Sequence, residues 1–452
     1  MDRIEHDALG EVAVPAEHHW GAQTQRSLQN FKIGPRMPMP LIRALVLLKK
    51  AAATANQQAG TVAPLAAQLI RDVCDEILSG KYDAEFPLCV YQTGSGTQTN
   101  MNVNEVIAHL VNERAGETLV HPNDTINRSQ STNDMFPSAI HVAAYLELTQ
   151  KLLPALDQLT VSFGMMEQQY ANVVKIGRTH LQDAVPITLG QEISAWRDCC
   201  EADATYLRSA LGGLQQLAVG GTAVGTGLNA PQGFDQAVCD RLNAELGCEF
   251  KPAANKFSAL GSKNALNFTH GALKTLAADL FKIASDVRLL ASGPRCGIGE
   301  LELPANEPGS SIMPGKVNPT QCEAMIMVCL RVMGNDTTVS FAAANGQLEL
   351  NVCMPLLAEV FLESVSLLSD AIESFDRLCV RGIVPNYERI SDNLNRSLML
   401  VTCLTPRIGY ENAAKAALHA HQQGCTLKQA VLALELLTEQ EFDDLCRPER
   451  MV

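Results

Sequence analysis

Residues 262–293, SKNALNFTHGALKTLAADLFKIASDVRLLASG, carry the clearest apolar pattern in the chain. Apolar residues recur at alternating short intervals, at Leu266, Leu273, Leu276, Leu280, Ile283, Val287 and Leu290. This spacing is typical of one face of an α-helix that packs nearly parallel to its neighbours. The stretch therefore predicts a long helix within a bundle.

Other segments extend the same pattern. A second run repeats the four-three alternation, at Phe361, Val365, Leu368, Ile372, Phe375 and Cys379. Residues 137–173 and 188–217 are also helical in composition, and Pro154 is expected to kink or break the first of them. Helices of roughly 25 to 30 residues are more than twice the usual length of about 11 or 12. Several such helices together indicate a long central bundle.

The changes of pattern along the chain predict an all-α fold in three domains. Residues 1–130 are broken by GPRMPMP at 34–40 and by Gly94 and Gly96, which favours a separate, mostly helical N-terminal domain. Residues 131–387 hold the long helices of the central bundle. After about Glu388 the segments shorten, which predicts a small C-terminal helical domain at 388–452. Aromatic residues make up only 5% of the chain, which favours helix over sheet.

Composition limits the classes of partner. Lys plus Arg number 35 against 49 Asp plus Glu, so the net charge of −14 argues against nucleic acid or an anionic membrane surface. An anionic small molecule is not excluded, because it responds to the local field of its pocket. The chain has 14 cysteines and no C-x-x-C pair, and its first residues do not resemble a signal or transit peptide. We expect a cytoplasmic protein with reduced cysteines.

Four loops interrupt the helical pattern with small polar residues. They are TGSGTQTNMN at 93–102, HPNDTINRSQSTND at 121–134, GRTHLQD at 177–183 and GSSIMPGKVNP at 309–319. Each precedes a helical segment, and helix N-termini present unpaired N–H groups that suit carboxylate oxygens.

Such residues also have an ordinary explanation as helix caps. Asn133 and Asp134 precede Phe136-Pro137, Thr188 and Gln191 form a capping box, and Asn318 is expected to cap a helix that begins at Pro319. Any one loop is more often a cap than a binding site. Four separate loops of this density in a helical protein of low charge are hard to explain as caps alone.

Three other chemistries fit the loops poorly. The Gly-Lys loop is not a nucleotide-binding P-loop, because Ser310 stands where the motif requires glycine and Val317 stands where it requires Ser or Thr. A metal site is not expected, since His121 and Asp124 have no further ligand at suitable spacing. No G-x-S-x-G motif indicates a serine hydrolase.

The loops together resemble the fumarase and aspartase superfamily, over essentially the whole chain. GSSIMPGKVNPTQCEA is similar to its signature, and five further segments fit the class II fumarase pattern in order: WGAQTQRSLQNF, TGSGTQTNMNVNEV, HPNDTINRSQSTND, GRTHLQDAVPITLGQE and GGTAVGTGLNA. Thr179-His180 and SGTQT at 95–99 favour fumarase over aspartase. Thr99, Thr132 and Tyr91 are mild departures from the pattern.

The resemblance implies reversible hydration of fumarate to L-malate, a step of the tricarboxylic acid cycle, without a metal or organic cofactor. By similarity Ser310 is the catalytic base, His180 handles the water or hydroxide through an ordered water, and Glu323 orients it. Lys316 and Asn318 resemble the residues that hold the substrate carboxylate. The other implied substrate-binding residues are Ser95, Gly96, Thr97, Ser131, Thr132, Asn133, Thr179, Ser311 and Val317.

Two more expectations follow from the resemblance. A secondary anion site would comprise His121, Pro122, Asn123 and Asp124, although Thr118 and Leu119 stand where a basic residue commonly precedes this motif. The family forms homotetramers whose active sites combine loops from three subunits, so the seam from Leu266 to Leu290 is expected to pack partly against other subunits.

Two alternatives stay open at this point. The chain could be another lyase of the superfamily, acting on aspartate, argininosuccinate or a methylated fumarate such as mesaconate. It could also be a helical scaffold without catalytic activity.

Overall fold

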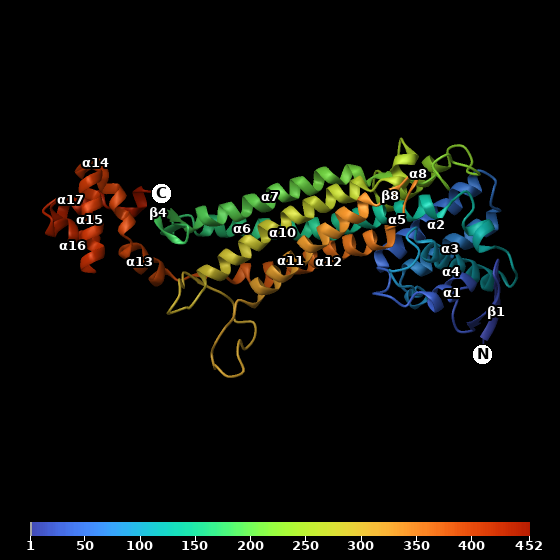
Figure 1. Ribbon diagram of the computed structural model, residues 1–452, viewed down its shortest axis with the longest axis horizontal. Helices are drawn as coiled ribbons and strands as arrows, with labels where there is room; N and C mark the ends of the chain where they lie inside the picture. The colour runs from blue at the N-terminus through green and yellow to red at the C-terminus, as the bar shows by residue number, and fades with distance from the viewer. Residues whose placement is uncertain (1) are drawn as a thin grey trace. The chain divides into compact units, whose positions relative to one another are not determined.

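The computed structural model describes residues 2–452 and is predominantly helical (Figure 1). The chain divides into two compact units. Unit 1 comprises Met1–Pro154, Thr205–Ala277 and Leu330–Ser369, and unit 2 comprises Ala155–Ala204, Ala278–Cys329 and Asp370–Val452. Within the described residues no helix combines the length and apolar character needed to cross a membrane.

Unit 1 contains most of the helices of the first third of the chain. Its helices are α1 (Ala22–Asn30), α2 (Met39–Gln58), α3 (Pro64–Leu78), α4 (Thr97–Ala115), α5 (Thr132–Glu147), α8 (Phe234–Leu246) and α9 (Lys256–Gly261). Its strands are β1 (Asp2–Asp7), β2 (Gly10–Pro15), β5 (Gln216–Leu217), β6 (Lys251–Pro252), β8 (Gly346–Gln347) and β9 (Leu350–Asn351). The strands pair only two by two, and β1 and β2 form an antiparallel hairpin.

Unit 2 contains one longer hairpin and the short helices of the C-terminal segment. Its strands are β3 (Val174–Thr179), β4 (Gln182–Thr188), β7 (Leu301–Glu302) and β10 (Val384–Pro385). Its helices are α13 (Tyr387–Arg396), α14 (Thr405–Ile408), α15 (Tyr410–Gln423), α16 (Leu427–Ala433) and α17 (Glu439–Leu445). The expected domain boundaries after residues 130 and 387 stay predictions.

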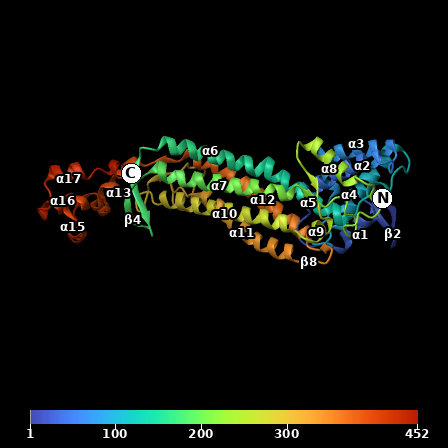
Figure 2. The same cartoon turned by 90° about the horizontal axis from the view of Figure 1, so that it is seen from above.

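Five long helices make up the remainder: α6 (Leu153–Gln169), α7 (Leu189–Leu214), α10 (Asn264–Leu290), α11 (Thr320–Ala344) and α12 (Met354–Leu378) (Figure 2). Contacts within unit 2 join three of them, because the rings of Phe163 and Trp196 pack edge to face and Trp196 Nε1 lies 3.4 Å from Asp286 Oδ2. Within unit 1, the imidazole of His270 on α10 bonds to Asp336 on α11 and to Ser364 on α12. The predicted bundle of long helices is confirmed.

The apolar seam of residues 262–293 lies on α10 as predicted. All seven seam residues are buried, and Leu290, the most exposed, is only 6% exposed. The second predicted run lies on α12 and is buried as well, with Cys379 directly after the helix. Because the chain by itself buries the seam, the expectation that Leu266 to Leu290 pack against other subunits is wrong. Other apolar side chains of α10 and α11 are exposed, including Phe268, Leu330 and Phe341.

The helical segment around Pro154 is interrupted but not broken. Helix α5 ends at Glu147, a π-helical turn follows at Leu148–Leu152, and α6 begins at Leu153. Proline lacks an N–H and its ring clashes with the carbonyl four residues earlier, so a widened turn before Pro154 accommodates both effects. The predicted kink thus takes the form of a π-helical turn.

The β3–β4 hairpin is the main element that the sequence analysis missed. The structure places GRTHLQD inside this hairpin, with Val174 opposite Thr188 and Thr179 opposite Gln182. The capping box of Thr188 and Gln191 is confirmed at the start of α7, with both hydrogen bonds present at 2.9 and 3.0 Å.

The seam should dominate the stability of α10. We expect Leu280→Ala to lower the free energy of unfolding by about 2–5 kcal/mol, because it leaves a cavity at a fully buried position. Leu289→Ala on the same helix, where the side chain is 38% exposed, is the matched control and should cost clearly less. Urea unfolding followed by circular dichroism measures both, and equal losses would contradict the assignment of the seam.

Candidate active site

The first polar loop fits its surroundings only because it contains glycine. A Cβ on Gly94 would lie 1.5 Å from the carbonyl oxygen of Val352. Gly96 has a φ of +78° and faces the ring of Phe136, so it too requires glycine. Helix α4 begins directly afterwards at Thr97 without a side-chain cap, and Ser95 Oγ lies 2.8 Å from Thr97 Oγ1. Gln92 Oε1 accepts the N–H of Thr99, so the loop presents two hydroxyl groups beside the N–H groups of Thr97 and Gln98.

The second polar loop leads into α5. Ser131 caps the helix and Asp134 completes a capping box, so α5 begins at Thr132 and not after Asp134 as expected, and Pro137 lies inside the helix. Burial raises the pKa of Asp134 to about 6, although its carboxylate accepts hydrogen bonds from the N–H groups of Ser131, Gly220 and Thr222. These bonds fix the start of α5 against the segment from 220 to 222.

Hydrogen bonds join these two loops within unit 1. Asn100 Nδ2 donates to Thr132 Oγ1 at 3.1 Å and to Asn127 Oδ1 at 3.3 Å. Asn133 Nδ2 donates to the carbonyl of Ala223 at 2.8 Å. Unit 1 thus holds six of the predicted substrate-binding residues: Ser95, Gly96, Thr97, Ser131, Thr132 and Asn133.

A cavity of about 590 Å³ lies beside the second loop. Ser131 lines it, together with two members of the predicted secondary site, Asn123 and Asp124. The rest of its lining is mostly polar and comprises Asn127, Arg128, Ser129, Gln130, Thr222, Ala223, Leu228 and Asn229. The lining combines amide and hydroxyl groups with one guanidinium, of Arg128, and one carboxylate, of Asp124, so it suits a polar ligand better than an apolar one.

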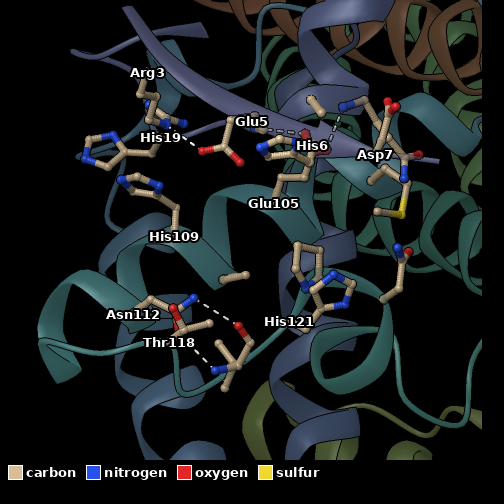
Figure 3. A pocket seen from close by; sticks show the side chains of 18 of the residues that line it. Arg3, Glu5, His6, Asp7, His19, Glu105, His109, Asn112, Thr118 and His121 are labelled. Atoms are coloured by element: carbon tan, nitrogen blue, oxygen red, sulfur yellow. Dashed lines mark hydrogen bonds and ion pairs between the residues drawn. The ribbon is translucent and has the colours of Figure 1, made fainter. Parts of the chain in front are cut away.

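A larger cavity, of about 800 Å³, lies beside the β1–β2 hairpin (Figure 3). His121, Pro122 and Asn123 of the predicted secondary site line it, together with Thr118, whereas Asp124 does not. His121 Nδ1 accepts the N–H of Asp124 and caps the π-helical turn Pro122–Ile126. The predicted secondary residues therefore lie between two cavities.

The other side of the larger cavity is rich in imidazole, from His6, His19 and His109 (Figure 3). Burial lowers the pKa of His109, and the electrostatic effect of the nearby Arg3 guanidinium lowers it further. The guanidinium of Arg3 already bonds to Glu5 and to the carbonyls of His18 and Trp20. The secondary anion site stays a prediction.

His180 lies at the tip of the β3–β4 hairpin in unit 2. The two-residue turn consists of His180 and Leu181, with φ values of 55° and 60°. Positive φ at both central positions defines a type I′ turn, which Asn-Gly usually forms. Non-glycine residues held there store strain, a common feature of functional sites. Thr179 and His180 are both exposed at this tip.

Buried charges hold the base of this hairpin. Lys175, which is 1% exposed, lies 2.9 Å from Glu192 and 3.2 Å from Glu300, and Arg178 lies 2.7 Å from Glu300. Burial alone would raise the pKa of Glu300, but Arg178, Lys175 and Asn393 together bring it below its usual value. Two cations of β3 are therefore fixed against the segment that leads to the fourth polar loop.

The fourth loop closes on itself around Ser310. Gly309 N–H donates to the carbonyl of Lys316 at 2.9 Å, and Asn318 Nδ2 donates to the carbonyl of Gly309 at 2.6 Å. Ser310 Oγ accepts the backbone N–H groups of Ile312, at 3.3 Å, and Met313, at 3.1 Å. The expected N-cap is wrong, because α11 begins at Thr320 and the Asn318 side chain closes the loop instead.

The remaining predicted residues also lie in unit 2. Ser311, Lys316 and Val317 are exposed on the loop, and Glu323 lies in the first turn of α11, half-buried. Unit 2 thus holds eight predicted site residues: Thr179, His180, Ser310, Ser311, Lys316, Val317, Asn318 and Glu323.

The structure adds residues that the sequence analysis did not find. Lys175, Arg178 and Glu300 support the hairpin, and Lys49 lies buried under the second polar loop, 2.9 Å from both Asn127 Oδ1 and Gln130 Oε1. The only signal for Lys49 was its position four residues after Leu45, on the buried face of α2.

Comparison with known families first defines the class of protein. The family described as "Lyase" matches residues 10–334, and the family described as "Fumarase C C-terminus" matches residues 400–452. The chain is thus a member of a lyase family, and the matched residues include the fourth polar loop at 309–319.

Individual relatives narrow the class. The class II fumarate hydratase of Bacillus subtilis (strain 168) is 55% identical over 455 residues, covering 100% of this chain and 98% of the relative. That of Helicobacter pylori (strain J99) is 54% identical with the same coverage. The crystal structure of class II fumarase from Schistosoma mansoni matches with a TM-score of 0.97 at 44% identity, covering 100% of this chain and 99% of the other. The chain belongs to the class II fumarate hydratase family.

The ion network under the hairpin can be tested directly. Glu300→Ala leaves Lys175 and Arg178 without their shared partner, so we expect it to lower the free energy of unfolding by about 3–5 kcal/mol at pH 7. Because the pKa of Glu300 is lowered, its contribution is present above its unfolded value of about 4.5 and is lost as the pH falls through the folded value. The difference between the parent and the variant should therefore shrink in strong acid.

Glu302→Ala is the matched control, since Glu302 is exposed and accepts only an amide of Asn386 at 3.2 Å. Denaturant unfolding at neutral and acid pH measures all three proteins. A loss in Glu300→Ala no greater than that in the control would show that the network does not support the hairpin.

Proposed function

We propose that this chain catalyses the reversible hydration of fumarate to L-malate, with Ser310 as the base. The observation that carries this proposal is the pair of backbone N–H groups that point at Ser310 Oγ, from Ile312 and Met313. A serine hydroxyl is a very weak acid, and its alkoxide forms only where donors and positive charge stabilise it. The same loop carries Lys316, which supplies that charge.

The reaction needs a base and stabilisation of the negative charge that develops. In the direction of elimination, Ser310 removes the proton from the carbon next to one carboxylate of malate. The electron pair moves onto that carboxylate, which becomes a doubly charged aci-carboxylate. In this proposal Lys316 stabilises it, together with the second N–H of the Asn318 amide, whose other N–H is in use within the loop.

The hydroxyl group then leaves as water. His180 donates the proton through an ordered water, and the electron pair of the aci-carboxylate forms the double bond of fumarate. An imidazole changes its protonation state near neutral pH, which suits a reaction that runs in both directions. Glu323 orients the water, and a new cycle begins when Ser310 loses its proton.

The residues of unit 1 recognise the second carboxylate. Ser95, Thr97, Ser131, Thr132 and Asn133 lie at the starts of α4 and α5. The N–H groups of Thr97 and Gln98 at the start of α4 and the positive dipole ends of both helices favour an anion, although the N–H groups at the start of α5 are bonded to Ser131 and Asp134. Thr179, Gly96, Ser311 and Val317 complete the proposed set of substrate contacts.

We propose that the protein is a homotetramer whose active sites each take loops from three subunits. The exposed apolar side chains support association, since Phe268 is 66%, Leu330 55% and Phe341 75% exposed. All 14 cysteines are free, which supports a reducing compartment, and we propose the cytoplasm.

The activity is tested by incubating the purified protein with malate and, separately, with aspartate, and following the ultraviolet absorbance of fumarate. We expect fumarate from malate only. Fumarate from aspartate alone would show that the protein deaminates aspartate and does not hydrate fumarate. No product from either substrate would support a scaffold without activity.

The assigned roles are tested in the same assay. Ser310→Ala and His180→Asn should each lower turnover by at least about 100-fold, the usual contribution of a general acid or base. Ser209→Ala, at an exposed serine of α7 that bonds only to the carbonyl of Tyr206, is the matched control and should retain turnover. Near-normal turnover in Ser310→Ala would refute the assigned base.

The assembly is tested by light scattering after gel filtration, where we expect the mass of four chains. Phe341→Asp should shift the protein to smaller species with lower activity, because it places a charge among apolar contacts. Tyr410→Asp, at an equally exposed aromatic residue of α15, is the control. A monomer with full activity would contradict both the tetramer and the shared sites.

A further inference from the structure

Lys49 is buried in unit 1 without a counter-ion at contact distance. It lies on α2 with 1% of its surface exposed, and its ammonium donates to the side-chain oxygens of Asn127 and Gln130, both at 2.9 Å. Among the described residues 2–452, its Nζ bonds to these two amides and forms no ion pair with a carboxylate. A buried ammonium with only neutral partners costs stability, so its presence calls for a functional reason.

The two residues that Lys49 contacts both line the 590 Å³ cavity beside Ser131. Gln130 directly precedes Ser131, and its amide also donates to the carbonyls of Ile126 and Arg128. The ammonium of Lys49 therefore holds two residues of the cavity wall, Asn127 and Gln130, in place.

Asn127 extends this support to the first polar loop. Its Oδ1 accepts a hydrogen bond from Lys49 Nζ at 2.9 Å. It also accepts hydrogen bonds from the amides of Asn100 and Asn104, both at 3.3 Å. Asn100 in turn donates to Thr132 Oγ1. Lys49 thus lies at the base of the hydrogen bonds that join the starts of α4 and α5.

We propose that Lys49 is a positioning residue of the substrate site, which orders Asn127 and Gln130 and provides the buried positive charge for binding a dicarboxylate. The proposal rests on the proposed function for the identity of the substrate. It assigns Lys49 no contact with the substrate, since its effect passes through the two amides and through the electric field.

The charge of Lys49 links ligand binding to pH. Burial lowers the pKa of Lys49 to about 7, and the nearby Asp134 on α5 and Cys74 on α3 oppose this shift. An anion bound in the cavity favours the charged ammonium, so above neutral pH its binding takes up a proton and weakens as the pH rises.

The same shift makes Lys49 costly for folding. Since its folded pKa lies below the unfolded value of 10.5, stability rises with pH between about 7 and 10.5, and the full cost is present below that window. Replacement of a buried charge by an apolar residue of similar volume is often neutral or stabilising. We therefore expect Lys49→Met to fold at least nearly as stably as the parent protein.

Lys50→Met is the matched control, because Lys50 is the next residue on α2 and pairs instead with Asp75 and Glu245. In the malate assay at pH 7, Lys49→Met should raise KM by about tenfold and lower kcat much less, whereas Lys50→Met should change neither substantially. Binding of succinate, an unreactive dicarboxylate, should weaken by a similar factor in Lys49→Met only. A KM and a succinate affinity equal to those of the control would overturn the proposal.

A second measurement does not depend on the folding of the Lys49 variant. Succinate binding to His180→Asn is followed by calorimetry at pH 8 in two buffers of different ionisation enthalpy, so that proton uptake is measured without that imidazole. Uptake of a proton supports the proposal, and its absence contradicts it. If the parent protein converts neither malate nor fumarate, the proposed function fails, while the succinate experiments still decide the role of Lys49.

Discussion

Every α-helix begins with N–H groups that have no partner inside the helix, and this constraint determines where polar side chains lie in this chain. Helix α1 meets it with the buried carboxylate of Glu105, which accepts the N–H groups of Gly21, Gln23 and Thr24. Helices α5 and α7 meet it with capping boxes. Helix α4 begins after Gly96, which has no side chain to cap it, and Gln92 Oε1 accepts the N–H of Thr99, so within the described residues only the N–H groups of Thr97 and Gln98 in this first turn lack a side-chain partner. The polar loop before α4 is one of those proposed to bind a carboxylate.

The long helices were predictable because their information is local. The four-three spacing on α10 and α12 needs no knowledge of the neighbours, and both seams are buried as expected. The β3–β4 hairpin was not predictable in the same way. Its turn of His180 and Leu181 lacks the Asn or Gly that usually indicates a type I′ turn, and its strands are short. Tertiary contacts hold a strained turn in place, and these contacts cannot be predicted from the local sequence.

In the candidate site, too, some parts were predictable from the sequence and others were not. The four loops could be found from the sequence because their small polar residues contrast with the helical pattern around them. The supporting charges could not, since Lys175 and Glu300 lie 125 positions apart in numbering and meet only in the fold. The buried face of α10 was also assigned correctly from spacing, but the expectation that this face packs against other subunits was wrong because the chain itself covers it. On this helix, Phe268 lies on the face that the chain leaves exposed, whereas Leu280 lies on the buried face.

Asn127 has a consequence for how this sequence can diverge. Its single amide oxygen receives three donors, from Lys49, Asn100 and Asn104, so a change at Asn127 leaves all three without this acceptor, whereas the loss of any one donor leaves the oxygen with two others. Of these four positions, Asn127 is therefore the one where substitution costs most. A descendant that kept the helical fold and lost its ligand would gain by replacing all four with apolar residues. The joint loss of these residues, visible from sequence alone, would identify such a descendant.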